Sequence, residues 1–160
     1  MMRISKRALL TGLGCALLTS CTSPRVVSQA AFPEEVDESQ ACKLISAYRV
    51  AHGLSGLRLD PELEKAAAAQ AMAMASTDTL SHTVAGSLRE RLDADHIRNR
   101  AAAENVSAGY FTLADAIEGW RRSPPHKANL LDPMMRRMGI GSAYVQNSRF
   151  HVYWSLILAD

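Results

Sequence analysis

Acidic residues are missing from the beginning of this chain. The first of its 16 acids is Glu34, whereas three basic residues lie within the first seven positions. Residues 8–18 are then uncharged and mostly apolar, a stretch too short to span a bilayer as a helix, which needs about 20 apolar residues. A basic segment followed by a short apolar one is typical of an export signal. The sequence therefore predicts a signal peptide over residues 1–20.

The apolar stretch ends in Leu18-Thr19-Ser20, and Cys21 follows directly. This resembles the lipobox of bacterial lipoproteins, in which a branched apolar residue and two small residues precede the cysteine that receives the lipid, including acyl chains such as palmitate. The resemblance implies that Cys21 anchors the protein to a membrane without spanning it. Thr22, in place of an aspartate, favours the outer membrane if the cell is Gram-negative. Ordinary signal cleavage near residues 28–30 and an uncleaved signal anchor are the alternatives.

Basic residues are too few for a nucleic-acid partner once the signal is removed. Loss of residues 1–20 lowers the Lys and Arg count from 18 to 15 and leaves the 16 acids, a balance of about −1. Phosphate binding needs a net basic face, so the composition argues against nucleic acid. Residues 21–37 contain two prolines and three acids with no apolar period, and they are interpreted as the lipidated Cys21 and a flexible tether. The folded domain is then expected over residues 38–160.

Cysteine is scarce as well. Cys15 would leave with the signal and Cys21 would be acylated, so only Cys42 remains for the domain. This excludes an intramolecular disulfide and with it the disulfide-stapled class of small secreted folds. Cys42 is interpreted as a small buried apolar residue, with a reactive thiol as the alternative.

Apolar residues recur with helical and then with strand periodicity along the domain. Helices are expected over 39–52, from 61 onward, over 87–92 and from 113 to the prolines at 124 and 125, and strands over 138–146 and 149–158. Ser39, Asp60 and Thr112 are the expected N-caps. The last strand is apolar on both faces, which indicates a sheet covered by helices on both sides. We therefore predict an α+β fold, an α-β-α sandwich around a short antiparallel sheet.

Several short motifs follow one another in a characteristic order. They are Ile45-Ser46-Ala47-Tyr48-Arg49, Leu59-Asp60-Pro61-Glu62-Leu63, Ser81-His82, Ala103-Glu104-Asn105-Val106, Ser123-Pro124-Pro125-His126-Lys127-Ala128-Asn129-Leu130-Leu131 and Gly139-Ile140-Gly141. Together they resemble the CAP superfamily (cysteine-rich secretory proteins, antigen 5 and pathogenesis-related 1 proteins), in its disulfide-free bacterial branch. The resemblance covers residues 40–159 and implies the same α-β-α sandwich.

The resemblance also implies a cleft in which His82, Glu104 and His126 meet. Animal and plant members often add a second glutamate three residues after the tryptophan, where this chain has Ser123. Glu118 lies two residues before Trp120, on a different helix face, and does not inherit that role. The expected site is therefore reduced to three residues.

Two imidazoles and one carboxylate suit a borderline divalent ion such as zinc, with water completing a tetrahedron. His82 and His126, with or without Glu104, are the candidate metal ligands. The same three groups also suit a hydrogen-bonded network in which Glu104 orients a histidine, or a set of ties between loops. No residue is assigned a catalytic role, and these same three residues are the candidates for one.

The remaining candidates have simpler interpretations. His52 is expected to interact with the carbonyls at a helix C-terminus, and His96 to lie in a solvated polar segment. His151 is interpreted as a sheet histidine, with a place at the border of the cleft as the alternative. Asn105 is expected to bond backbone groups, and no nucleophile motif surrounds Ser81.

Three functions remain open. The first is a surface-anchored, non-enzymatic, monomeric envelope module that binds a lipid, a glycan or a protein through the His/Glu cleft. The second is a metal-dependent, peptidase-like hydrolase with Glu104 as general base. The third is a structural envelope or stress protein.

Overall fold

A computed structural model describes residues 30–160 of the protein, so the predicted signal peptide and Cys21 lie outside the described residues. The described elements are β1 (Ala31–Glu34), α1 (Glu38–Val50), β2 (Arg58–Leu59), α2 (Pro61–Ser76), α3 (Leu88–Ala94), β3 (Ala102–Ala108), α4 (Leu113–Arg122), α5 (Pro124–Leu130), β4 (Arg137–Val145) and β5 (Val152–Ala159). Between residues 30 and 160, no helix is long and apolar enough to cross a membrane.

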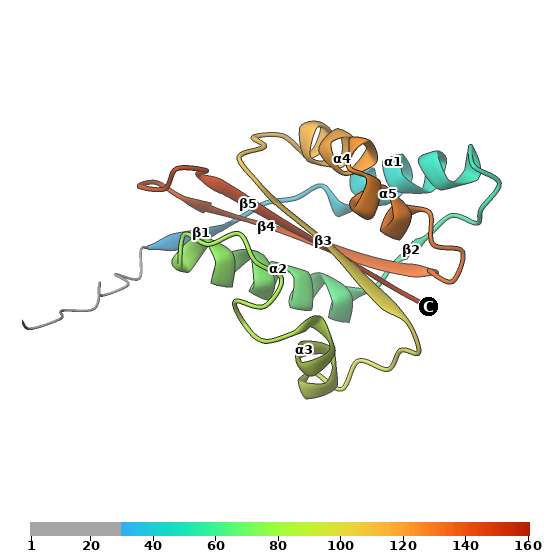
Figure 1. Cartoon of the computed structure of the whole chain (residues 1–160), viewed down its shortest axis with the longest axis horizontal. Helices are drawn as coiled ribbons and strands as arrows, with labels where there is room; N and C mark the ends of the chain where they lie inside the picture. Colours follow the sequence, from blue (N-terminus) through green and yellow to red (C-terminus); the bar gives the residue numbers. More distant parts are fainter. Residues whose placement is uncertain (1–29) are drawn as a thin grey trace, which may run out of the picture.

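The elements form three layers, as predicted. The sheet order is β1-β4-β5-β3, antiparallel throughout, and the short β2 adds a parallel pairing with the start of β4. Helices α1, α4 and α5 lie on one side of the sheet and α2 and α3 on the other (Figure 1). The predicted α-β-α sandwich is confirmed.

Helix α2 is the element most closely packed on the sheet. Its predicted inner face is confirmed, since all five residues are at most 3% exposed: Leu63, Ala66, Ala67, Ala71 and Met74. Opposite them on β4 lie Gly139 and Gly141, where even a Cβ atom would meet the α2 backbone at 2.1 and 2.4 Å. Alanines on the helix and glycines on the strand thus bring the two backbones together.

Local sequence signals set most helix ends. The Asp60 side chain accepts hydrogen bonds from the amides of Glu62 and Leu63, and Thr112 caps α4, as predicted. The first helix is a correction, because Asp37 and not Ser39 is its N-cap. The Asp37 carboxylate accepts from the Gln40 amide at 2.8 Å, so the helix begins ahead of the predicted cap.

The prolines at 124 and 125 end one helix and begin another. Helix α4 stops at Arg122 as expected, and Ser123 is extended. Pro124 then occupies the first position of α5, where its missing N–H is not needed and its fixed φ suits the helix. This second helix was not predicted, and it carries His126.

Three strands were also not predicted. Strand β3 begins with alanines that favour a helix, and it is extended because it pairs with β5 over its whole length. Strand β2 has two residues. Strand β1 lies in the segment interpreted as tether, and it pairs with the end of β4 from Ala31 to Glu34. The folded domain therefore begins earlier than residue 38.

Candidate functional site

The candidate site lies across β3, an edge strand of the sheet. Consecutive side chains of a strand point to opposite faces. Glu104 points to the side of α2 and α3, where it contacts Arg91, and Asn105 points to the side of α5, where it contacts the His126 backbone. One dipeptide therefore connects both faces of the sheet at this edge.

Glu104 has a partner on each carboxylate oxygen. Arg91 Nη2 donates to Oε1 at 2.6 Å, and Ser155 Oγ donates to the same oxygen at 3.3 Å. His82 Nδ1 donates to Oε2 at 2.9 Å, since a carboxylate can only accept. The Glu104 side chain is 2% exposed. A buried carboxylate needs such compensation, because isolated burial of its charge is costly.

His82 reaches Glu104 from the loop after α2. Buried Gln70 holds this loop, since its Nε2 donates to the Ser81 carbonyl at 2.8 Å. The His82 side chain is 55% exposed. With Nδ1 donating to the carboxylate, Nε2 of the neutral ring is an acceptor that faces away from Glu104.

His126 approaches from the opposite side of the sheet. Asn105 Nδ2 donates to the His126 carbonyl at 3.1 Å, and Asn129 Nδ2 donates to Asn105 Oδ1 at 2.9 Å and to the Glu104 carbonyl at 3.3 Å. These bonds fix α5 on β3. The predicted backbone-bonding role of Asn105 is confirmed.

The two histidines are close enough to interact electrostatically. Burial lowers the pKa of His126 below its ordinary value, and the charge of His82 lowers it further. The neutral form of His126 is therefore favoured in the folded protein. This site presents two imidazoles near a carboxylate that already accepts three hydrogen bonds within the protein.

The described residues do not fit a three-ligand metal centre. Between residues 30 and 160, no three His, Cys, Asp or Glu side chains are grouped so that they could hold a metal ion. Glu104 already holds His82 and Arg91. A metal ion on Glu104 would compete with these partners for the lone pairs of the carboxylate.

Two further residues near the family's fourth position lie apart from this network. Ser123 is the N-cap of α5 without a side-chain cap bond. Glu118 pairs with Arg121 on the surface of α4, at 3.2 Å. Neither replaces the missing glutamate.

Sequence reasoning missed the residues that hold the site together. Arg91, Ser155, Gln70 and Asn129 all contact it, and none was assigned a role. One signal was available: a glutamate in an otherwise apolar segment requires a buried donor. The sequence does not reveal which of its many basic residues supplies that donor.

The other predicted candidates have structural roles. His52 Nδ1 lies 2.8 Å from the Tyr48 carbonyl at the end of α1. Cys42 is half-buried against the core, and its thiol donates to the Leu57 carbonyl at 3.3 Å. His151 is a correction, because it precedes β5 with a φ of +63° and its buried Nδ1 has no hydrogen-bond partner. It lies six residues, about 20 Å, from Ile157, the residue paired with Glu104.

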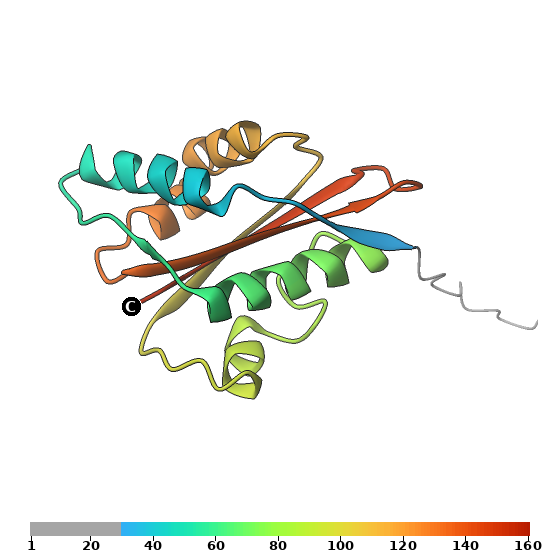
Figure 2. The ribbon, with the colours of Figure 1, turned by 180° about the vertical axis from the view of Figure 1, so that it is seen from behind.

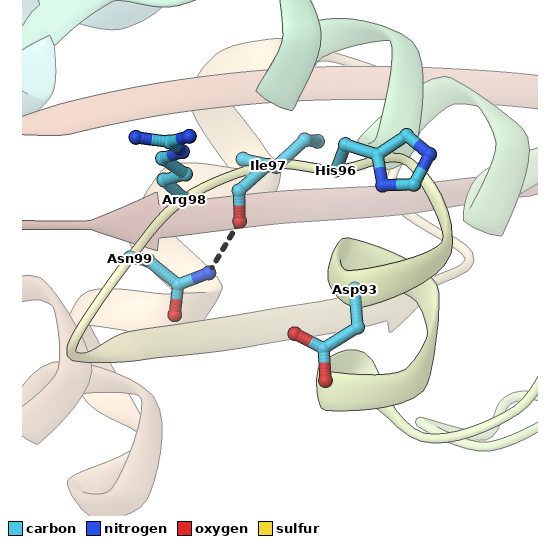
Figure 3. Close-up of a pocket in the computed structure, with 5 residues that line it drawn as sticks. All are labelled: Asp93, His96, Ile97, Arg98 and Asn99. Atoms are coloured by element: carbon cyan, nitrogen blue, oxygen red, sulfur yellow. Dashed lines mark hydrogen bonds between the residues drawn. The ribbon is translucent and has the colours of Figure 1, made fainter.

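His96 lies beside a surface cavity of about 470 Å³ at the end of α3 (Figure 3). Asp93, Ile97, Arg98 and Asn99 complete its lining. Asn99 Nδ2 donates to the Ile97 carbonyl at 2.9 Å, and the His96 amide donates to the Asp93 carbonyl at 3.1 Å. The segment is exposed around buried Ile97, which agrees with the interpretation of a solvated polar loop.

A family profile described as the cysteine-rich secretory protein family, CAP, matches residues 43–158. The chain belongs to this family. The CAP match includes β3, both histidines and the closing hairpin, so the site described above lies within the family's domain.

A relative of known sequence also supports the family assignment. The membrane protein YlbC of Bacillus subtilis is 30% identical over 131 residues, which are 78% of this chain and 38% of that protein. The chain therefore spans about two fifths of this relative.

Two solved structures share the fold. An extracellular protein with an SCP domain from Bacillus anthracis superposes with a TM-score of 0.67 at 24% identity, over 76% of this chain and 39% of that one. An outer surface protein of Borrelia burgdorferi gives 0.69 at 20% identity, over 81% of this chain and 98% of that one.

Proposed function

We propose that this CAP domain is a lipid-anchored, non-enzymatic binding module of the bacterial cell envelope, and that its ligand binds at the rim formed by His82 and His126. The observation that carries the proposal is the state of Glu104. Both of its oxygens accept hydrogen bonds within the protein, and its side chain is 2% exposed. The only carboxylate of the site is thus committed to structure.

A hydrolase that used Glu104 as its general base would need this carboxylate to reach the substrate. A general base must come within hydrogen-bond reach of the proton it removes. Glu104 reaches His82 and Arg91 instead, and its side chain is closed to a substrate at 2% exposure. This geometry argues against Glu104 itself as the general base.

The exposed part of the site suits a polar ligand. His82 presents Nε2 on a half-exposed ring, and His126, whose neutral form is favoured, lies close enough for the charge of His82 to act on it. A neutral imidazole such as that of His126 can donate to and accept from hydroxyl and amide groups. We infer an uncharged envelope ligand rich in such groups, a glycan or a peptide.

The proposed location is the cell envelope, through acylated Cys21. The export signal and lipobox support it, as do relatives described as a membrane protein, an outer surface protein and an extracellular protein. A monomer is proposed, because one chain contributes every residue of the site.

The test has two parts. Metabolic labelling with an alkynyl palmitate should label the protein and not Cys21→Ser, and an unlabelled protein would overturn the anchor. Extraction of the tagged envelope protein should enrich one glycan or peptide that is lost in His82→Ala and His126→Ala and kept in His96→Ala. Equal recovery from all four proteins would overturn the binding site.

A further inference from the structure

Four aromatic rings form a row on the surface at the hairpin end of the sheet. They come from β1 (Phe32), β4 (Tyr144), the β4–β5 turn (His151) and the β3–α4 loop (Phe111). Phe32 pairs in register with Tyr144, so their side chains are neighbours on one face. The His151 ring lies 6.2 Å from that of Tyr144, nearly parallel at 17°, and 6.2 Å from that of Phe111.

Two members of this aromatic row are largely in solvent. Phe111 is 67% exposed and Phe32 57%, although the chain has only three phenylalanines. Aromatic side chains usually contribute to folding by burying 150–250 Å² each. Exposed apolar surface that is gathered in one place marks an interaction site more often than scattered residues do.

The turn beneath the row is firmly held. Ser148 Oγ accepts hydrogen bonds from the amides of Phe150, at 3.0 Å, and His151, at 3.3 Å, and donates to the Asp78 carboxylate. His151 keeps a φ of +63° there, which a non-glycine residue adopts only when its surroundings impose it. The ring of His151 is therefore presented by a fixed backbone.

The row lies where the chain would come from the membrane. Ala30, the first described residue, is nine positions after Cys21, so an extended chain places it at most about 32 Å away. Phe32 is two residues further along. Both ribbon views place β1 and the hairpin at one end of the sheet, beyond α1 and α4 (Figures 1 and 2). An acyl chain on Cys21 would keep this end of the domain near the bilayer.

We propose that the aromatic row rests on the bilayer surface when the protein is anchored. The proposal rests on the lipid anchor of the proposed function. Tyr144 and His151 each carry a polar edge, which is favoured at the level of lipid headgroups, and the rings of Phe32 and Phe111 are apolar groups of the kind that interfacial segments bury at the headgroup boundary. Glu34 lies on the same face as Phe32 and accepts a hydrogen bond from Ser142 at 3.5 Å, and Arg149 lies in the hairpin turn with its guanidinium 5.0 Å from the Phe150 ring. Charges of both signs at this end of the domain suit zwitterionic headgroups.

Tryptophan fluorescence in vesicles tests this on the full lipid-modified protein. The native Trp120 and Trp154 are 0% and 4% exposed and supply a constant background. Phe111→Trp places a reporter in the row. Met134→Trp is the matched control, since Met134 is 50% exposed and precedes β4, about 30 Å along that strand from the hairpin.

Both variants are incorporated into phosphatidylcholine vesicles with brominated acyl chains, and bound protein is isolated by flotation. Interfacial groups lie about 5–10 Å into the headgroup boundary. Relative to vesicles without bromine, we therefore expect the emission of the added tryptophan in Phe111→Trp to fall roughly twofold, and that in Met134→Trp to remain unchanged. Phe32→Trp is the second reporter if Phe111→Trp does not fold.

The outcomes separate this proposal from the previous one. Protein that floats with equal emission from the row and control reporters overturns the bilayer contact and leaves the anchor standing. The aromatic row would then be covered by a second copy of the protein or by the chain's own N-terminal segment. Protein that does not float overturns the anchor, and the bilayer contact with it.

Discussion

The guanidinium of Arg91 and the carboxylate of Glu104 lie 2.6 Å apart, with side chains 10% and 2% exposed. This buried ion pair links α3 to β3. It also leaves Glu104 Oε2 free to orient His82. The pair therefore stabilises the fold and shapes the site at the same time.

Glu104→Gln should destabilise the protein strongly. The substitution removes the negative charge and leaves Arg91 buried without its partner, which costs about 3–5 kcal/mol in comparable sites. Urea unfolding would measure the loss. The control is Asp93→Asn, which breaks the exposed Arg89–Asp93 pair and should cost at most about 0.5 kcal/mol. Similar losses in both variants would contradict the role given to Glu104.

Features set by neighbouring residues were predictable, and those set by distant pairing were not. Helix α2 follows from the Asp60-Pro61 start and a regular apolar face. Strand β3 contains no such pattern, and only its pairing with β5 makes it extended. The family resemblance supplied Glu104 as a site residue. Its partner Arg91 could not be chosen from the sequence, because the contact depends on how α3 sits on the sheet.

Acidification should weaken the fold through His126. The pKa of its imidazole is lowered in the folded state from 6.5, by burial first and by the charge of His82 second. The unfolded chain therefore binds the proton more tightly. The contribution of neutral His126 to the free energy of unfolding is fully present above pH 6.5. It is lost as the pH falls from 6.5 through the pKa of His126 in the folded protein.

NMR titration of the His126 ring checks both causes. In the wild-type protein its pKa should lie below 6.5, and His82→Ala should raise it part of the way back, because burial remains. His126→Gln should reduce the loss of stability on acidification. A ring that titrates above its ordinary pKa would refute this account.

Arg49→Lys should show that the buried guanidinium organises the α5 end of the site. Arg49 is fully buried, and it donates to the carbonyls of Ser55, Leu130, Asp132 and Met135 at 2.7–3.0 Å. One ammonium group cannot reproduce this fork. At least one carbonyl loses its donor, so we expect a loss of about 2 kcal/mol or more.

Thermal and urea unfolding of Arg49→Lys would measure that loss, with exposed Arg58→Lys as the control. The same variant should shift the NMR signals of His126, since Leu130 ends the helix that carries it. An unchanged Arg49→Lys protein would mean that backbone geometry alone holds α5.

Gly141→Ala should disrupt the contact between α2 and the sheet. A Cβ at this position would lie 2.4 Å from the Ala68 Cα and 2.5 Å from its amide nitrogen. Both are helix backbone, so no side chain can turn aside and the helix itself must move. Overpacking that shifts the backbone costs about 1–3 kcal/mol and occasionally more, and we expect the upper end of this range here. Because α2 also carries Gln70, which holds the His82 loop, ligand binding should weaken as well.

Gly56→Ala is the control for this prediction. In that variant the atom nearest to the new Cβ is the Ser46 Cβ at 3.2 Å, and we expect a loss of stability below about 1 kcal/mol. Equal melting temperatures for the two variants would show that α2 does not need glycine beneath it.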